Sequence, residues 1–98
     1  MEVKILKVSS KELQMEIKGE DYTLLNLLQK TLLENPGVEA AGSRIPHRLL
    51  GSAIFTLRVK GDKPPFEVLF EALDRIKSQS AEFRKAFQEG LKAWKSKG

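Results

Sequence analysis

The chain has 98 residues, of which 41% are hydrophobic and 31% are charged, and its formal net charge is +4 at pH 7. This length suits one domain with a single core, and the composition is typical of a globular protein. The chain contains no cysteine, which excludes disulfides and thiolate metal sites, and it shows no membrane-length apolar run or signal-peptide pattern, so we expect a cytoplasmic protein.

The N-terminal part of the chain predicts two antiparallel strands. Residues 3–8 are apolar and rich in β-branched side chains, and apolar and polar residues alternate over 13–18. A period of two is typical of a strand with one buried face. Ser9-Ser10-Lys11 lies between the two segments and can form the hairpin turn.

The next segment predicts a helix that is unusually rich in leucine. It starts after Gly19, where Asp21 or Thr23 can cap it, and Asn35-Pro36-Gly37 ends it. One face carries Leu24, Leu25, Leu28 and Leu32, and two further leucines, Leu27 and Leu33, widen it to more than half of the circumference. A surface helix needs an apolar stripe of about 100°. The excess predicts two neighbours, the sheet of this chain and another surface.

Two more strands and a long helix are expected in the second half. Residues 38–45 are small and apolar, and residues 53–59 alternate clearly. Gly61-Asp62-Lys63-Pro64-Pro65 then forms a turn, with Pro65 suited to the first turn of a helix. The order strand-strand-helix-strand-strand-helix predicts a two-layer α+β fold, a ββαββα sandwich with a four-stranded, mainly antiparallel sheet and two helices.

The final helical pattern is longer than the sheet needs. Apolar residues recur at spacings of three and four up to Trp94, and an unbroken helix would span roughly 44 Å against about 23 Å for a strand of seven residues. Its second half, with Phe83, Phe87, Leu91 and Trp94, would then need another cover. The alternative is a kink near Ser78-Gln79-Ser80 that folds this end back.

No residue pattern indicates an active site, a metal site or a cofactor site. His47 is the only histidine and has no cysteine beside it, and the paired carboxylates Glu20 and Asp21 suit a helix start better than acid-base chemistry. Arg44, His47 and Arg48 crowd a loop that also holds Pro46. This loop is either a docking surface for carboxylates or a solvated loop.

The C-terminal segment is basic. After Ala81 the cations are Arg84, Lys85, Lys92, Lys95 and Lys97, against the carboxylates of Glu82 and Glu89 alone. Such a tail can contact phosphates or an acidic partner. It can equally be a solvated helix end whose lysines complement the helix dipole.

Two motifs together resemble a known family. Gly19-Glu20-Asp21-Tyr22-Thr23-Leu24-Leu25-Asn26-Leu27-Leu28 and Gly42-Ser43-Arg44-Ile45-Pro46-His47-Arg48-Leu49 are similar to segments of the smaller alpha-like subunits of RNA polymerase, the family of archaeal subunit L. The resemblance covers nearly the whole chain in length and element order. It implies that residues 1–98 form a single alpha-like RNA polymerase dimerisation domain.

The resemblance also implies a function in transcription. The chain would be a non-catalytic assembly subunit of DNA-directed RNA polymerase, a nucleotidyltransferase. It would form a heterodimer with the larger alpha-like subunit, named D in archaeal polymerases, as a platform for the large catalytic subunits. DNA would be contacted only through the complex, with no membrane and no small-molecule ligand. The implied partner interface is Leu24, Leu25, Leu28, Leu32, Phe83, Phe87, Leu91 and Trp94. Arg44, Pro46 and His47 would contact a large subunit.

A second function class stays open on the residues alone. A small basic domain with an open sheet face can bind RNA by stacking bases on aromatic side chains, and could self-associate. Phe55 is the only aromatic residue in the clearest strand, and its polar alternates are Thr56, Arg58 and Lys60. The capacity for stacking is therefore small.

Overall fold

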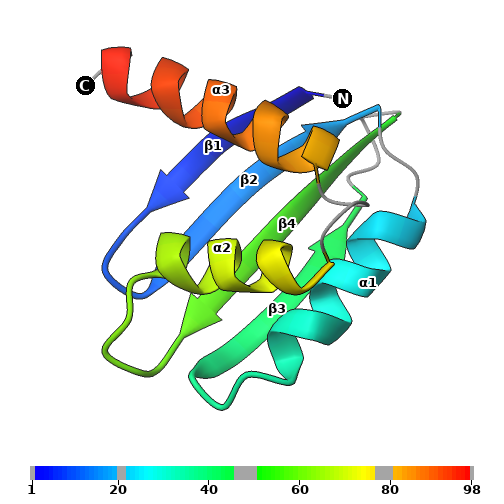
Figure 1. Cartoon of the computed structure of the whole chain (residues 1–98). Helices are drawn as coiled ribbons and strands as arrows, with labels where there is room; N and C mark the ends of the chain where they lie inside the picture. The colour runs from blue at the N-terminus through cyan, green and yellow to red at the C-terminus, as the bar shows by residue number, and fades with distance from the viewer. Residues whose placement is uncertain (1, 20–21, 46–50, 77–80, 98) are drawn as a thin grey trace.

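The computed structural model describes residues 2–19, 22–45, 51–76 and 81–97. Along the chain its elements are β1 (Glu2–Val8), β2 (Glu12–Lys18), α1 (Tyr22–Leu33), β3 (Val38–Arg44), β4 (Ser52–Val59), α2 (Pro65–Ile76) and α3 (Ala81–Lys97). The strands form one antiparallel sheet in the order β1-β2-β4-β3, and the helices pack over one of its faces (Figure 1). The predicted two-layer α+β fold is confirmed.

The alternation along β2 and β4 decides which face of the sheet is buried. The register places Leu13 opposite Leu57 and Met15 opposite Phe55, and all four side chains are fully buried. Since successive side chains of a strand point to opposite faces, the residues between them lie on the outer face. Hydrophobic alternation in the sequence therefore predicted the core-facing side of these strands correctly.

Local backbone chemistry ends the elements where the sequence predicts. In the β1–β2 turn, the backbone N–H of Ser9 donates to the carbonyl oxygen of Glu12 at 2.9 Å. Beyond α1, the side-chain oxygen of Asn35 accepts from the N–H of Gly37 at 2.8 Å, the local turn that asparagine favours. Asp21 lies outside the described residues, as does the side chain of Thr23, so the predicted helix cap is not described.

The surplus leucine of α1 is covered from within the chain. Leu24, Leu25, Leu28 and Leu32 are buried in the common core, and α1 packs against both β3 and α2. The second neighbour expected for this helix is therefore α2. Among the described leucines of α1, Leu33 is the one that is mostly outside the core, with 51% of its surface exposed.

The helix expected from Pro65 to Trp94 is divided into α2 and α3. α3 packs on β1 rather than extending beyond the sheet, and Phe83 and Phe87 are fully buried. The expectation of one long helix was wrong, because folding the second half back buries two phenylalanines that an extended helix leaves in water. Residues 77–80, where the alternative kink was placed, lie outside the described residues.

Candidate protein-interaction surface

The described residues do not assemble a metal centre. In the ranges described, no group of three or more His, Cys, Asp or Glu side chains is placed to hold a metal ion. None of the described helices has the length and apolar character needed to cross a membrane. Glu20, Asp21 and His47 lie outside the described residues.

Most side chains of the expected partner interface fill the core of this chain. Six of the eight are buried, namely Leu24, Leu25, Leu28, Leu32, Phe83 and Phe87. Leu91 is half-buried against the core, and Trp94 has 39% of its surface exposed. In the folded chain, a partner could reach only Leu91 and Trp94 of this set without rearrangement.

Phenylalanine rings from two helices meet around Phe87 of α3. The ring centroid of Phe87 lies 5.8 Å from that of Phe66 and 5.5 Å from that of Phe70, both edge-on. The ring of Phe83 stacks on that of Phe87, with the two centroids 6.4 Å apart. Aromatic pairs of this geometry add to the free energy of burial, so this cluster joins α2 to α3.

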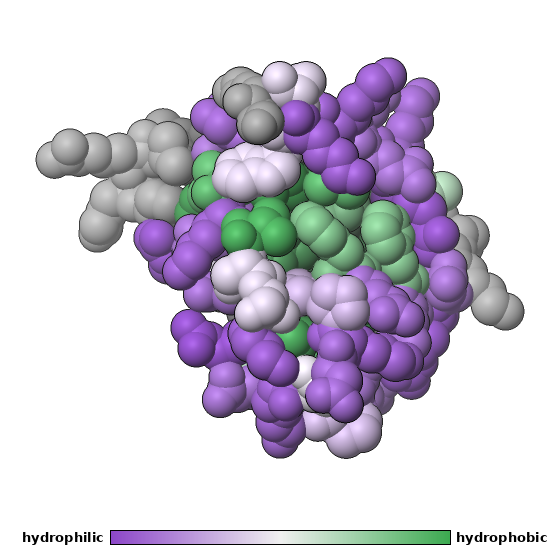
Figure 2. All heavy atoms as spheres, turned by 90° about the vertical axis from the view of Figure 1, so that its left-hand side faces the viewer, coloured by the Kyte–Doolittle hydropathy of each residue, from purple (hydrophilic) through white to green (hydrophobic). Residues whose placement is uncertain are grey.

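The outer part of this cluster continues into an exposed apolar surface. Phe66 and Phe70 are half-buried, and Leu91 and Trp94 follow Phe87 by one and two helical turns along α3. Figure 2 shows an apolar area in the middle of this face, bordered by hydrophilic side chains. We call Phe66, Phe70, Leu91 and Trp94 the α2/α3 patch. It is the surface that best fits an apolar partner.

Charged side chains border the α2/α3 patch. The guanidinium of Arg84 lies 5.9 Å from the ring centroid of Phe70 and donates to the carboxylate of Asp74. Lys63, before α2, donates to Glu71 at 2.6 Å, and this hydrogen bond, with the charge of Glu71, raises the pKa of Lys63 above its ordinary value of 10.5. The Arg84–Asp74 pair therefore fixes charged groups beside Phe70 of the patch, whereas Glu71 lies on the side of α2 that faces α1.

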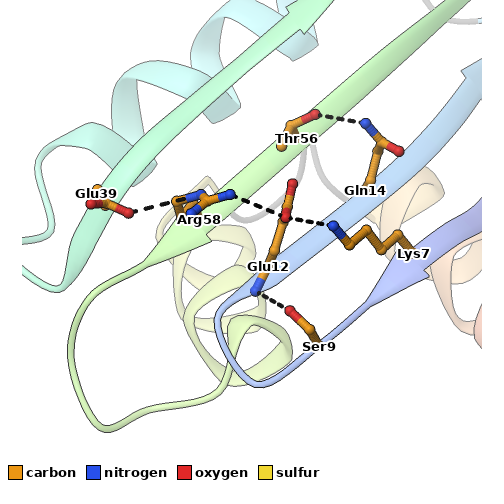
Figure 3. Close-up of polar contacts among 7 residues, drawn as sticks. All are labelled: Lys7, Ser9, Glu12, Gln14, Glu39, Thr56 and Arg58. Carbon is orange, nitrogen blue, oxygen red and sulfur yellow. Dashed lines mark hydrogen bonds and ion pairs between the residues drawn. The ribbon is translucent and has the colours of Figure 1, made fainter.

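The outer face of the sheet is largely polar, although Ile54 lies on it and is buried. Glu12 accepts from Lys7 at 3.1 Å and from Arg58 at 3.3 Å, and Arg58 also lies 3.8 Å from a carboxylate oxygen of Glu39 (Figure 3). In the described strands, no aromatic side chain lies on this face, since Phe55 is fully buried on the other side. Base stacking on this face would have no aromatic platform.

The predicted cationic loop is described only at its start. Arg44 is the last residue of β3, and its side chain is exposed. Pro46, His47 and Arg48 lie outside the described residues. The structure therefore places one of the three residues expected to contact a large subunit.

Phe66 and Phe70 were missed as surface residues by the sequence reasoning. Their spacing of four puts them on one side of α2, next to the buried stripe that contains Leu69 and Leu73. That spacing was the available signal. It could not be interpreted alone, because which side of α2 meets α3 depends on the direction in which α3 folds back.

Comparison with known proteins identifies relatives over most of the chain. Residues 12–86 match the family model described as RNA polymerase Rpb3/Rpb11 dimerisation domain. The chain is 36% identical to DNA-directed RNA polymerase subunit Rpo11 of Sulfurisphaera tokodaii over 83 residues, which is 85% of this chain and 89% of that protein. It is 34% identical to subunit Rpo11 of Methanothrix thermoacetophila over 92 residues, covering 94% of this chain and 100% of that protein.

A solved structure shares the fold. The crystal structure of DNA-directed RNA polymerase subunit L from Thermoplasma acidophilum superimposes with a TM-score of 0.69. The two chains are 20% identical, and the match covers 98% of this chain and 94% of that one. The agreement over nearly the full length supports the sheet order and helix positions described above.

Proposed function

Because the chain belongs to the RNA polymerase Rpb3/Rpb11 dimerisation domain family, we propose that it is a non-catalytic assembly subunit of DNA-directed RNA polymerase. The relatives named Rpo11 are subunits of archaeal polymerases, which supports a function in archaeal transcription. We place this function in the cytoplasm as part of the proposal. Nucleotide addition would take place in other subunits of the complex. This chain would contribute architecture to the reaction.

The proposed partner is the larger alpha-like polymerase subunit, the one named D in archaea. Together the two chains would form a one-to-one heterodimer on which the large catalytic subunits mount. The family description names a dimerisation domain, and this is the support for a protein partner rather than a ligand. Arg44, Pro46 and His47 stay candidates for contact with a large subunit, with charge-assisted hydrogen bonds to carboxylates as the physical basis.

The observation that carries this proposal is the α2/α3 patch. Exposed apolar surface ringed by polar residues typically marks a protein interaction site, and obligate interfaces are apolar like a core cut in half. Of the eight residues first assigned to the interface, Leu91 and Trp94 lie on this patch. The six buried residues would support the patch from below, unless the helices rearrange when the partner binds.

Co-expression with the larger alpha-like subunit tests this proposal. We expect the parent chain to co-purify as a one-to-one heterodimer, as measured by light scattering. The double variant Leu91→Ser/Trp94→Ser should bind at least about tenfold more weakly, because apolar contacts of this size contribute more than about 1.4 kcal/mol to binding. Lys92→Ser, an exposed neighbour on α3, is the matched control and should bind like the parent.

Thermal unfolding of the isolated variants separates binding from folding. The double variant should have a lower Tm than the parent but remain folded at the temperature of the binding assay, because Leu91 packs against the core only in part and Trp94 is partly exposed. Normal heterodimer yield with the double variant would show that the α2/α3 patch is not the interface. A parent chain that stays monomeric beside the larger alpha-like subunit would remove the proposed function itself.

A further inference from the structure

β1 is an edge strand with one unpaired side. It pairs with β2 only, at one end of the sheet order β1-β2-β4-β3. The unpaired N–H and C=O groups of an edge strand are a template for pairing with a strand of another chain. A β-bulge between Ile5 and Lys7 interrupts the register further along β1, so the regular part of this edge is residues 2–5.

α3 lies against this strand along a side made of small residues. Ala86, Gly90 and Ala93 are spaced by four and three along α3. Together with Glu89 of α3 and with Glu2 and Val3 of β1, they line a hollow where the two elements meet. A Cβ atom added at Gly90 would lie 2.2 Å from the carbonyl oxygen of Val3 and 3.1 Å from its carbonyl carbon. Both atoms belong to the backbone and cannot move aside as a flexible side chain can.

This contact explains a glycine in the middle of a helix. Glycine is less favourable than alanine in a helix interior, because it loses more backbone freedom on folding. At Gly90 the absence of a Cβ is what lets α3 approach the backbone of β1. Gly42 in β3 provides a contrast, since a Cβ there would meet nothing within 4 Å.

We propose that the unpaired side of β1 is a strand-pairing surface for a second copy of this chain. The close contact of Gly90 with Val3 holds α3 against β1, and α3 in this position prevents the second strand from pairing. Charge complementarity supports the second copy as the occupant. If two β1 strands pair antiparallel with Val3 opposite Val3, Glu2 of each copy lies directly opposite Lys4 of the other. Opposite charges at facing positions favour pairing. This proposal is independent of the polymerase function.

The variant Gly90→Ala tests whether Gly90 allows α3 to pack against β1. If Gly90 only weakened the helix, replacing it by alanine would raise the Tm. If the absence of a Cβ at Gly90 allows α3 to pack on β1, alanine lowers the Tm by roughly 5–15 °C through the clash with Val3. Gly42→Ala is the matched control, because it makes the same chemical change in open space and should shift the Tm far less. An unchanged or higher Tm for Gly90→Ala would overturn the proposal.

The same variant tests strand pairing. We expect Gly90→Ala to form dimers by light scattering at concentrations where the parent chain remains free of them. The chain has no cysteine, so Glu2→Cys and Lys4→Cys can be introduced separately in the Gly90→Ala background and mixed. Directly opposite residues of antiparallel strands have Cα atoms about 4.5–5.5 Å apart, within disulfide range. We expect a disulfide between the two variants, and none when the same pair is made with Gly90 present.

A Gly90→Ala chain that is destabilised but stays monomeric and forms no such disulfide would overturn strand pairing. If the variant does not accumulate in folded form, NMR of the parent chain carries the test. The α-protons of Gly90 should then give nuclear Overhauser contacts to Val3, and Glu2 and Lys4 cysteine variants with Gly90 should cross-link only under mild denaturant that releases α3. Absence of the Gly90–Val3 contacts would show that α3 does not pack on β1 through Gly90.

Discussion

At the scale of single residues, Glu12 connects three strands on the outer face of the sheet. One of its carboxylate oxygens, Oε1, accepts from Lys7 and from Arg58, and its backbone N–H donates to Ser9 in the adjoining turn at 3.1 Å. Its side chain is only 15% exposed, whereas those of Lys7 and Arg58 are more than half exposed. A carboxylate shared by two cations and partly shielded from water contributes more than an isolated surface pair.

We predict that Glu12→Gln lowers the free energy of unfolding by about 0.5–1 kcal/mol. The loss should shrink at high salt, because mobile ions screen the attraction that glutamine removes. Urea unfolding of parent and variant at low salt and at about 0.5 M salt measures both effects.

Glu39→Gln is the matched control for this prediction. Its carboxylate is 53% exposed and lies at 3.8 Å from Arg58, so its loss should have a smaller effect than that of Glu12. The prediction would be contradicted if both variants lost the same free energy of unfolding, or if the loss for Glu12→Gln did not change with salt concentration. Either result would show that the network contributes little as a unit.

At the scale of elements, the position of α3 decides what Phe87 does. A helix extending beyond the sheet would present Phe87 to a partner, and the isolated chain would then lose little from its removal. In the structure Phe87 is fully buried and contacts three other phenylalanine rings. The two arrangements therefore predict different stabilities for the isolated chain.

We predict that Phe87→Ala destabilises the isolated chain by about 3–4 kcal/mol, since it removes apolar burial and leaves a cavity between α2, α3 and the sheet. Trp94→Ala, on the same helix but 39% exposed, should cost less than half of this. Urea unfolding followed by far-UV circular dichroism measures both. Similar stability of parent and Phe87→Ala would mean that α3 does not pack on this sheet in solution.

Burial also changes how the α1 leucines can be tested. Leu28 is completely buried, so an aspartate there would place an unpaired charge in the core. Leu28→Asp would fail to fold whether or not α1 contacts a partner. Variants at Leu91 and Trp94 are informative because these side chains are accessible in the folded chain.

At the scale of the whole molecule, the distribution of charge bears on the RNA-binding alternative. The net charge is +4, but on the outer face of the sheet the cations Lys7 and Arg58 are paired with the carboxylate of Glu12. RNA binding by an open sheet usually needs unpaired cations and exposed aromatic rings together. The described part of this face offers no aromatic ring, and its central cations are already engaged.

We predict that the isolated chain binds single-stranded RNA more weakly than about 10 µM at about 150 mM salt. Fluorescence anisotropy with a labelled oligonucleotide measures this affinity. Submicromolar binding that weakens steeply as salt is raised would contradict the prediction and favour nucleic-acid binding over assembly.

Local patterns were enough to predict most elements and the class of fold. The period of two along β2 and β4, the leucine stripe of α1 and the turn residues Asn35 and Gly37 each act over a few neighbouring positions. Because these interactions depend on residues close in the chain, they can be deduced from it directly. The resemblance in two short motifs also indicated the family, which residue chemistry alone did not.

Tertiary structure decided where the apolar surfaces meet. The sequence shows that α1 and the C-terminal helix each have more apolar surface than one sheet needs, but helical periodicity is the same whether the cover is a partner or the same chain. The contact of α1 with α2, the fold-back of α3 onto β1 and the close approach at Gly90 join residues far apart in sequence. Contacts within the chain bury most of this apolar surface and release water from it. The surface available to a partner is therefore the part that these contacts leave exposed.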